Sequence, residues 1–276
     1  MSESMNMIEK VMNANIFHPP HRRQDDSVDY ITRTKKEDGA PIKVAYFVLH
    51  PEPPKTIKKK YGDDHKNNSD LPYLVWNHGN ACDIQEIRMN MENMFERMGR
   101  NIGIIAYDYE GYGYSSGVCR ESNCYRDLEI VIDFCTDDLG ISKNRLFLVG
   151  QSLGTGVVID YVCNHNWKTP IILFSPYKTI SRVIYDPSIF NVGMYLTVNA
   201  VDRFRSIDKI GQIDAPIIIY HGVKDRLIEF YHALELQKTN PQNTTVILIR
   251  EADHNDILSH VDFREIWNVV FNHLNN

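Results

Sequence analysis

A serine between two glycines is the feature of this sequence that most directly predicts chemistry. It lies in the run Gly150-Gln151-Ser152-Leu153-Gly154, which follows four apolar residues at 146–149 and precedes an apolar pattern of helical spacing. A sharp turn between a buried strand and a helix exposes a serine hydroxyl as a nucleophile, and glycines permit the close backbone approach of that turn. The pentapeptide alone also occurs in ordinary turns, but this context favours Ser152 as a catalytic nucleophile.

The residues that would activate this serine follow it in the order carboxylate, then histidine, which is typical of one class of hydrolase. An apolar strand pattern at 217–220 leads into a turn that ends at Asp225, and a second pattern at 246–249 leads to His254. We predict that His254 takes the proton of Ser152 and that Asp225 orients the imidazole ring and stabilises its charged form.

Four other residues are weaker candidates for the acid or the base. Asp253 and Asp256 lie too close to His254 in sequence to reach its far ring nitrogen easily, and Asp256 is better explained as a residue of a helix first turn. His221 and Asp202 are expected to be structural.

Two backbone donors are also needed, because acyl transfer passes through an oxyanion. The N–H of Leu153 is one candidate, and the loop His78-Gly79-Asn80-Ala81 offers the N–H of Asn80 or of Ala81 as the other. The same loop also fits a helix-entry turn in which Asn80 or Asp83 caps the next helix, and both interpretations can hold together.

The elements that must position these residues alternate between strand and helix from Leu71 onward. Strands are predicted at 71–77, 102–107, 146–149, 171–174, 217–220 and 245–249, and helices at 84–98, 124–139, 229–237 and 256–274. This alternation predicts a mostly parallel central sheet with helices on both faces, whose loops converge on one crevice. Strand patterns at 28–34 and 42–49 flank Asp38-Gly39 and predict an N-terminal antiparallel hairpin.

The long interruption of this alternation predicts where a substrate would bind. We expect a small cap at about 177–215 whose apolar side chains form an acyl pocket, although each of them could equally pack against the core. The pocket candidates are Ile189, Phe190 and Met194 in this segment, with Asn80 and Tyr109 in the loops beside the crevice.

Length and composition limit the remaining possibilities. The 276 residues are 43% hydrophobic, so we expect one domain over 1–276, with an N-terminal extension at 1–27 and a charged loop at 51–70. A net charge of −6 disfavours nucleic acid as a partner. The five cysteines form no C-x-x-C pair, and we expect no disulfide framework, no metal and no cofactor.

The same features bear on location. The sequence does not open with a charged region followed by a long apolar stretch, and no apolar run approaches the length that crosses a bilayer. With unpaired cysteines indicating a reducing compartment, we expect a cytoplasmic protein whose membrane contact is peripheral at most.

Taken together, these motifs resemble those of the α/β-hydrolase-fold serine hydrolases. Within that superfamily the sequence is similar to the α/β-hydrolase-domain protein depalmitoylases and their fungal Bem-type relatives. The likeness extends from about Tyr30 to the C-terminus and is carried by the segments 77–81, 107–109, 111–113, 115–117, 150–152, 206–210 and 254–257. It implies an α/β-hydrolase fold with Ser152 as nucleophile, Asp225 as acid, His254 as base, and Ala81 and Leu153 as oxyanion donors.

We therefore expect an esterase or thioesterase that works through an acyl-enzyme. By the resemblance, its substrate is an acyl ester or thioester, which includes acylated proteins. The depalmitoylases carry an acylated N-terminal cysteine cluster, whereas the first cysteine here is Cys82. A serine peptidase is one alternative, but it would need a peptide-recognition site that the sequence does not display. A non-catalytic binding module is the other, but it would have no reason to keep all three predicted catalytic residues. No sequence feature indicates an oligomeric state.

Overall fold

The computed structural model describes residues 13, 14, 16–23, 25, 27–34, 41–52, 70–180 and 203–275. Most of the predicted N-terminal extension and charged loop lies outside these residues, as do Ile189, Phe190 and Met194 of the predicted cap. The described chain divides into two compact units, one formed by 19–148 with 262–275 and the other by 13–18 with 149–261. The expected single domain stays a prediction, and each unit is described by itself.

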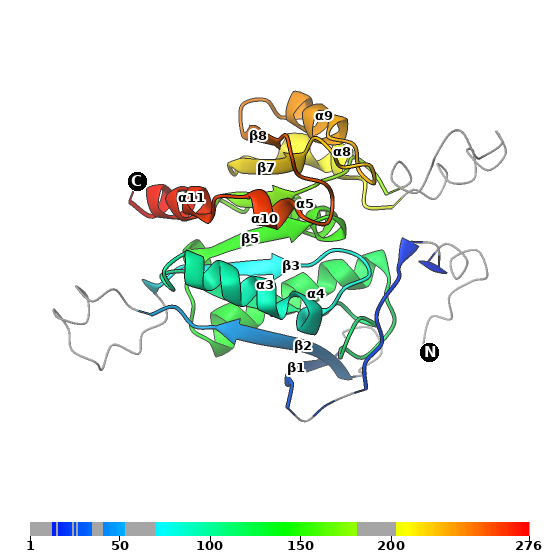
Figure 1. Ribbon diagram of the computed structural model, residues 1–276. Coiled ribbons are helices and arrows are strands. Elements are labelled where there is room, and N and C mark those ends of the chain that lie inside the picture. The colour runs from blue at the N-terminus through cyan, green and yellow to red at the C-terminus, as the bar shows by residue number, and fades with distance from the viewer. Residues whose placement is uncertain are drawn as a thin grey trace. The chain divides into compact units, whose positions relative to one another are not determined.

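The first unit contains the N-terminal strands (Figure 1). Its described strands are β1 (Asp29–Thr34), β2 (Pro41–Leu49), β3 (Tyr73–Asn77) and β4 (Gly103–Tyr107), in the order β1-β2-β4-β3. β1 pairs antiparallel with β2, which confirms the predicted hairpin, and β2 pairs antiparallel with β4. β3 and β4 are parallel, and all their residues are buried, as their continuous apolar sequences predict.

The longer segment of the second unit begins within β5, at Val149, and contains the strand ends that precede the predicted catalytic residues. β5 (Leu146–Gln151), β6 (Ile171–Phe174), β7 (Ile217–Gly222) and β8 (Thr244–Ile249) are neighbours in that order, and each adjacent pair is parallel. Gln151 pairs with Phe174, Phe174 with Tyr220, and Tyr220 with Ile247, so the strands end at about the same level. The loops after β5, β7 and β8 therefore leave the same edge of this sheet.

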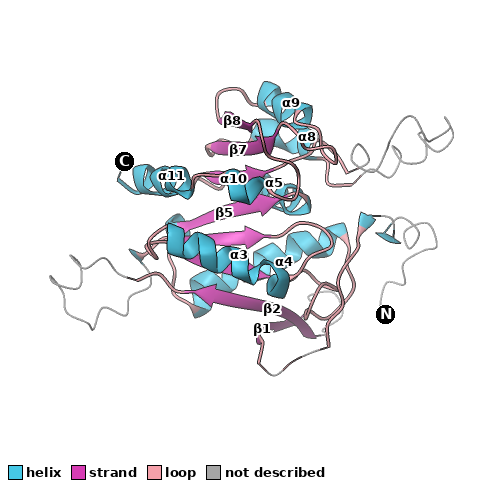
Figure 2. Cartoon of the chain, in the orientation of Figure 1, coloured by secondary structure: helices cyan, strands magenta, loops and turns pink. Residues whose placement is uncertain are grey.

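Helices connect these strands in both units (Figure 2). The first unit has α3 (Ile84–Arg97) against β2 and β4, α4 (Glu121–Asp133) against β1, and α11 (Phe263–Asn275) against α3. The second unit has α5 (Leu153–Asn164), α8 (Ser206–Lys209), α9 (Tyr231–Thr239) and α10 (Ile257–His260). Asp83 caps α3 by accepting hydrogen bonds from the amides of Gln85 and Glu86 at 3.0 Å, so the capping interpretation of this loop is confirmed.

Two predicted helices have different bounds in the structure. The helix predicted at 124–139 begins at Glu121 and continues beyond Asp133 as a π-helical turn, Phe134–Asp138. The helix predicted at 256–274 is divided into α10 and α11, because Val261 is extended, with φ −82° and ψ 133°. Asp262 then accepts a hydrogen bond from the amide of Arg264 at 3.1 Å, a side-chain cap that favours a new helix start.

Gly150 is a position in the second unit where the fold has no room for a side chain. A Cβ atom there would lie 2.7 Å from the carbonyl oxygen of Gly154 and 2.7 Å from the Cα of Thr155. Both are backbone atoms of α5, which cannot shift without moving the helix. Gly150→Ala should therefore lower the free energy of unfolding by about 1–3 kcal/mol, measured by urea denaturation.

Gly211→Ala is the matched control in the same unit. Its Cβ would meet Thr239 at an ordinary contact distance, 3.4 Å from Cγ2 and 3.6 Å from the carbonyl oxygen. This variant should keep near wild-type stability, and an equal loss in both variants would contradict the steric argument.

Candidate active site

Ser152 lies between the end of β5 and the start of α5 in a left-handed conformation, with φ 49° and ψ −116°. This region is strained for a residue other than glycine and persists only where surrounding bonds enforce it. The Ser152 amide donates to the carbonyl of Phe174 at 2.9 Å, and its carbonyl accepts from the amide of Thr155 at 3.0 Å. β6 and α5 thus hold the turn that presents the Ser152 hydroxyl.

The structure brings Ser152 together with His254 and Asp225 within the second unit. The His254 Nε2 lies 3.1 Å from the Ser152 Oγ, and its Nδ1 lies 2.8 Å from the Asp225 Oδ2. These distances fit a hydroxyl that passes its proton to Nε2 while the carboxylate accepts the Nδ1 hydrogen. The arrangement can generate a nucleophilic serine.

The Asp225 carboxylate is buried and ionised. Burial alone raises its pKa, but hydrogen bonds from His221, His254 and the Ile228 amide outweigh that effect and hold the pKa of Asp225 well below its usual range. Its Oδ1 accepts from the amides of Leu227 at 3.0 Å and Ile228 at 2.8 Å. A fixed negative charge therefore faces the imidazole at neutral pH and can stabilise its charged form.

Backbone contacts join the loop of the acid to the loop of the base. The amide of Val223 donates a hydrogen bond to the carbonyl of Ile249 at 2.9 Å, and the amide of Lys224 donates one to the carbonyl of Ala252 at 3.0 Å. A Cβ on Gly222 would lie only 2.4 Å from the Ala252 oxygen, so this approach requires glycine. The two loops are consequently held together beside the strand ends that carry them.

The rival carboxylates Asp253 and Asp256 bond to the turn around His254. The Asp253 amide donates to the Asp256 Oδ1 at 2.8 Å, and the Asp256 amide donates to the Asp253 Oδ1 at 3.0 Å. Asp256 directly precedes α10, as its predicted place at a helix start requires. The third rival, Asp202, lies outside the described residues.

The predicted oxyanion donors belong to different units. Leu153 is the first residue of α5 in the second unit. Ala81 belongs to the first unit, where it has φ 57° and its amide donates to the Asn80 Oδ1 at 3.0 Å. The same Asn80 oxygen accepts from the Tyr112 hydroxyl at 2.6 Å. The assignment of these donors stays a prediction. It requires the Ala81 amide to release the Asn80 Oδ1 and to donate its hydrogen bond to the substrate oxygen instead.

Tyr109 and His78 form a buried contact in the first unit. The Tyr109 side chain has no exposed surface, and its hydroxyl donates to the carbonyl of His78 at 2.9 Å. The His78 ring is also fully buried, which lowers its pKa to about 4, and its Nδ1 lies 2.7 Å from the carbonyl oxygen of Gly79. A proton on Nδ1 would brace this loop, whereas Tyr109 presents no free surface to a ligand in this conformation.

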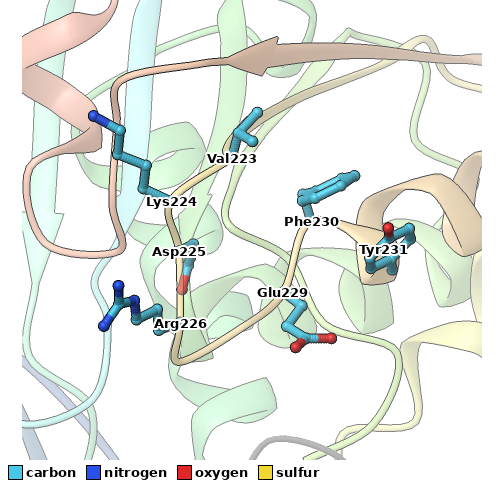
Figure 3. Close-up of a pocket in the computed structure, with 7 residues that line it drawn as sticks. All are labelled: Val223, Lys224, Asp225, Arg226, Glu229, Phe230 and Tyr231. Carbon is cyan, nitrogen blue, oxygen red and sulfur yellow. The ribbon is translucent and has the colours of Figure 1, made fainter.

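A pocket of about 430 Å³ lies on the loop that carries Asp225 (Figure 3). Its lining includes the charged side chains of Arg226 and Glu229 and the stacked rings of Phe230 and Tyr231, whose centroids are 4.3 Å apart. The acyl pocket predicted from the sequence involves Ile189, Phe190 and Met194, which lie outside the described residues, so that pocket stays a prediction.

Two further observations concern the described part of the chain. It contains no group of three or more His, Cys, Asp or Glu side chains arranged to hold a metal ion. None of its helices combines the length and apolar character needed to cross a membrane.

Comparison with known proteins identifies the family. No protein-family model matches the chain. Over 200 residues, however, it is 37% identical to the protein L404 of Acanthamoeba polyphaga mimivirus, whose name assigns it to the α/β hydrolases, and the match covers 72% of each protein. The chain therefore belongs to the α/β-hydrolase family, as the resemblance predicted.

More distant relatives agree with this assignment. The mouse and human α/β-hydrolase domain-containing protein 17C are 31% identical over 192 residues, or 70% of this chain, and the match spans 57% and 55% of their lengths. Among solved structures, the protein Est1E of Butyrivibrio proteoclasticus, with ferulic acid bound, matches with a TM-score of 0.64 and 18% identity, over 90% of this chain and all of that one. The Pyrococcus furiosus esterase Pf2001 matches with a TM-score of 0.63 and 16% identity, over 94% and 97%. These likenesses show the α/β-hydrolase fold.

Proposed function

We propose that this chain is a serine hydrolase that cleaves acyl esters or thioesters through an acyl-enzyme on Ser152. The observation that carries the proposal is the continuous hydrogen-bonded array from the Ser152 hydroxyl through His254 to Asp225. The strained backbone of Ser152 adds support, because such strain is typical of functional sites. Fluorophosphonate labelling of Ser152, argued in the Discussion, is the direct test.

In the proposed reaction His254 acts first as a base and then as an acid. Its Nε2 accepts the Ser152 proton as Oγ attacks the acyl carbon, and it returns that proton to the leaving alcohol or thiol. The amides of Leu153 and Ala81 are the proposed oxyanion donors. Water, deprotonated by the same Nε2, then attacks the acyl-enzyme and releases the acid together with free Ser152.

An acylated protein is the substrate class that we propose for this site, with the thiol or hydroxyl of the deacylated protein as the leaving group. The resemblance to protein depalmitoylases supports it, as does the similarity to the α/β-hydrolase domain-containing protein 17C. The similarity to the Pyrococcus furiosus esterase Pf2001 supports acyl transfer in general.

The length of the acyl chain can be tested with a series of p-nitrophenyl esters from acetyl to decanoyl. If Ile189, Phe190 and Met194 line an acyl channel, each buried methylene should contribute about 0.8 kcal/mol, or about fourfold in kcat/KM, until the channel is full. The measurement is kcat/KM below the concentration at which each ester forms micelles. A steady fall from acetyl onward would contradict a lipid-acyl substrate.

Phe190→Ala separates a channel from simple core packing. The variant should flatten the rise in kcat/KM with chain length if the Phe190 ring contacts the acyl chain. If the ring only packs on the core, the variant should lose stability while the chain-length preference stays unchanged.

A further inference from the structure

His221 is a fully buried histidine beside the acid, and it was expected to be only structural. It occupies the next-to-last position of β7 and pairs with Leu248 of β8. Its Nε2 lies 2.7 Å from the carbonyl oxygen of Ile228 and 3.5 Å from the Asp225 Oδ2. A carbonyl oxygen can only accept a hydrogen bond, so the hydrogen must be on Nε2. The Nε2–H group therefore points to the turn that carries the acid.

The backbone of Ile228 is held at both its amide and its carbonyl group by this arrangement. Its amide donates to the Asp225 Oδ1 at 2.8 Å, and the His221 ring donates to its carbonyl. Since His221 belongs to the sheet, the ring fixes the Asp225–Ile228 turn relative to β7. The other carboxylate oxygen, Oδ2, is thereby directed to the His254 Nδ1, which is 2.8 Å away.

Of the two ring nitrogens of His221, only Nε2 forms a hydrogen bond with a described residue. Its Nδ1 is buried and has no hydrogen-bond partner among the described residues. A buried polar atom without a partner costs stability, so the hydrogen bond of the other nitrogen is the one that holds the ring. The polar interactions of this ring are therefore directed to the acid turn.

We propose that His221 is a positioning residue for the hydrolytic reaction, which acts by holding the Asp225 turn and thereby orienting the His254 ring. The inference rests on the proposed catalytic roles of Ser152, His254 and Asp225. It predicts a specific kinetic defect when the Nε2 donor is removed, since the carboxylate then gains freedom to turn away from His254.

Two substitutions test the donor. His221→Phe keeps a ring of similar size but has no N–H, and it should lower kcat by about 10- to 100-fold with little change in KM. His221→Gln retains an N–H that can reach the Ile228 carbonyl, and it should recover most of the lost kcat. The downfield proton resonance of His254 Nδ1–H should shift or broaden in His221→Phe and persist in His221→Gln. Equal kcat loss in the two variants would overturn the role of the donor.

A double-mutant cycle shows whether His221 acts through the acid. In an Asp225→Asn background, adding His221→Phe should change kcat by less than about threefold, because the group that it positions is already disabled. A full additional loss would overturn the proposal. If Asp225→Asn itself leaves kcat near wild type, the proposed triad fails; if only His221→Phe is silent, the inference about His221 fails alone.

Asn240→Ala is the matched control for destabilisation in the same unit. Asn240 is buried, and its Nδ2 donates to the carbonyls of Ile210 and Ile213, both at 2.8 Å. Its replacement removes both of these buried hydrogen bonds, so urea denaturation should show a stability loss similar to that of His221→Phe. The kcat and the His254 resonance of Asn240→Ala should stay at wild-type values. A comparable loss of kcat in this variant would indicate that His221→Phe acts through stability alone.

Discussion

Ser152→Ala should abolish covalent labelling by a fluorophosphonate and lower turnover of acyl esters by at least about 10⁴-fold. The expected size follows from the role of Oγ, which would form the bond to the acyl carbon and has no substitute 3.1 Å from the His254 Nε2. Labelling is measured by intact mass, and the modified residue is located by peptide mapping. The alanine variant should keep the circular dichroism and unfolding midpoint of a folded protein.

Ser175→Ala is the matched control for this experiment. Ser175 also has φ 49°, follows β6 at the level where Ser152 follows β5, and is buried. No histidine among the described residues hydrogen-bonds its hydroxyl. Ser175→Ala should therefore keep full labelling, and modification at Ser175 instead of Ser152 would mean that the wrong serine had been identified.

The positions of the three predicted catalytic residues could be read from the sequence because each follows an apolar strand pattern. Val149, Ile219 and Ile247 belong to apolar runs that identify β5, β7 and β8 without homologues. Parallel strands bring their carboxyl ends to one edge of the sheet. A serine, a carboxylate and a histidine that each follow such a strand are therefore close in space although they are far apart in the sequence. The sharp turn at Ser152 could also be predicted from the sequence, because Gly150 and Gly154 lie two positions before and after it.

Other features depend on contacts that no local pattern encodes. The division between α10 and α11 depends on an extended Val261 and on the Asp262 side chain, within a sequence whose apolar spacing suits one helix. The Asn80 side-chain oxygen accepts hydrogen bonds from the adjacent Ala81 amide and from the hydroxyl of Tyr112, which lies 32 positions further along the chain. Sequence spacing predicted the loop, but it did not predict that the Ala81 amide donates its hydrogen bond to the Asn80 side chain.

The contact of His221 was missed for a related reason. A polar residue at the end of an apolar strand, four positions before the acid, was the available signal. Its importance lies in the Ile228 carbonyl, which faces back to the ring only after the chain has turned beyond Asp225. A backbone atom of this kind has no signature in the sequence.

Asp225→Asn should lower kcat by about 10⁴-fold while the protein stays folded. The amide group of the new side chain can turn its NH₂ to the His254 Nδ1, so that Nδ1 becomes the acceptor and the hydrogen moves to Nε2. That tautomer cannot take the proton of Ser152, whose Oγ lies 3.1 Å from Nε2. The measurement is kcat from steady-state hydrolysis of one ester, with active enzyme counted by fluorophosphonate titration.

The neighbouring carboxylates provide the contrast that makes this test specific. Asp253→Asn and Asp256→Asn remove charges of the same type within two residues of His254, yet these side chains accept hydrogen bonds from turn amides, at 3.0 and 2.8 Å. An asparagine carbonyl oxygen can still accept those bonds, so each variant should lose less than about tenfold in kcat. If Asp256→Asn were more damaging than Asp225→Asn, the acid of the proposed triad would have to be Asp256, and the 2.8 Å contact between Asp225 and His254 would not be the one that orients the base.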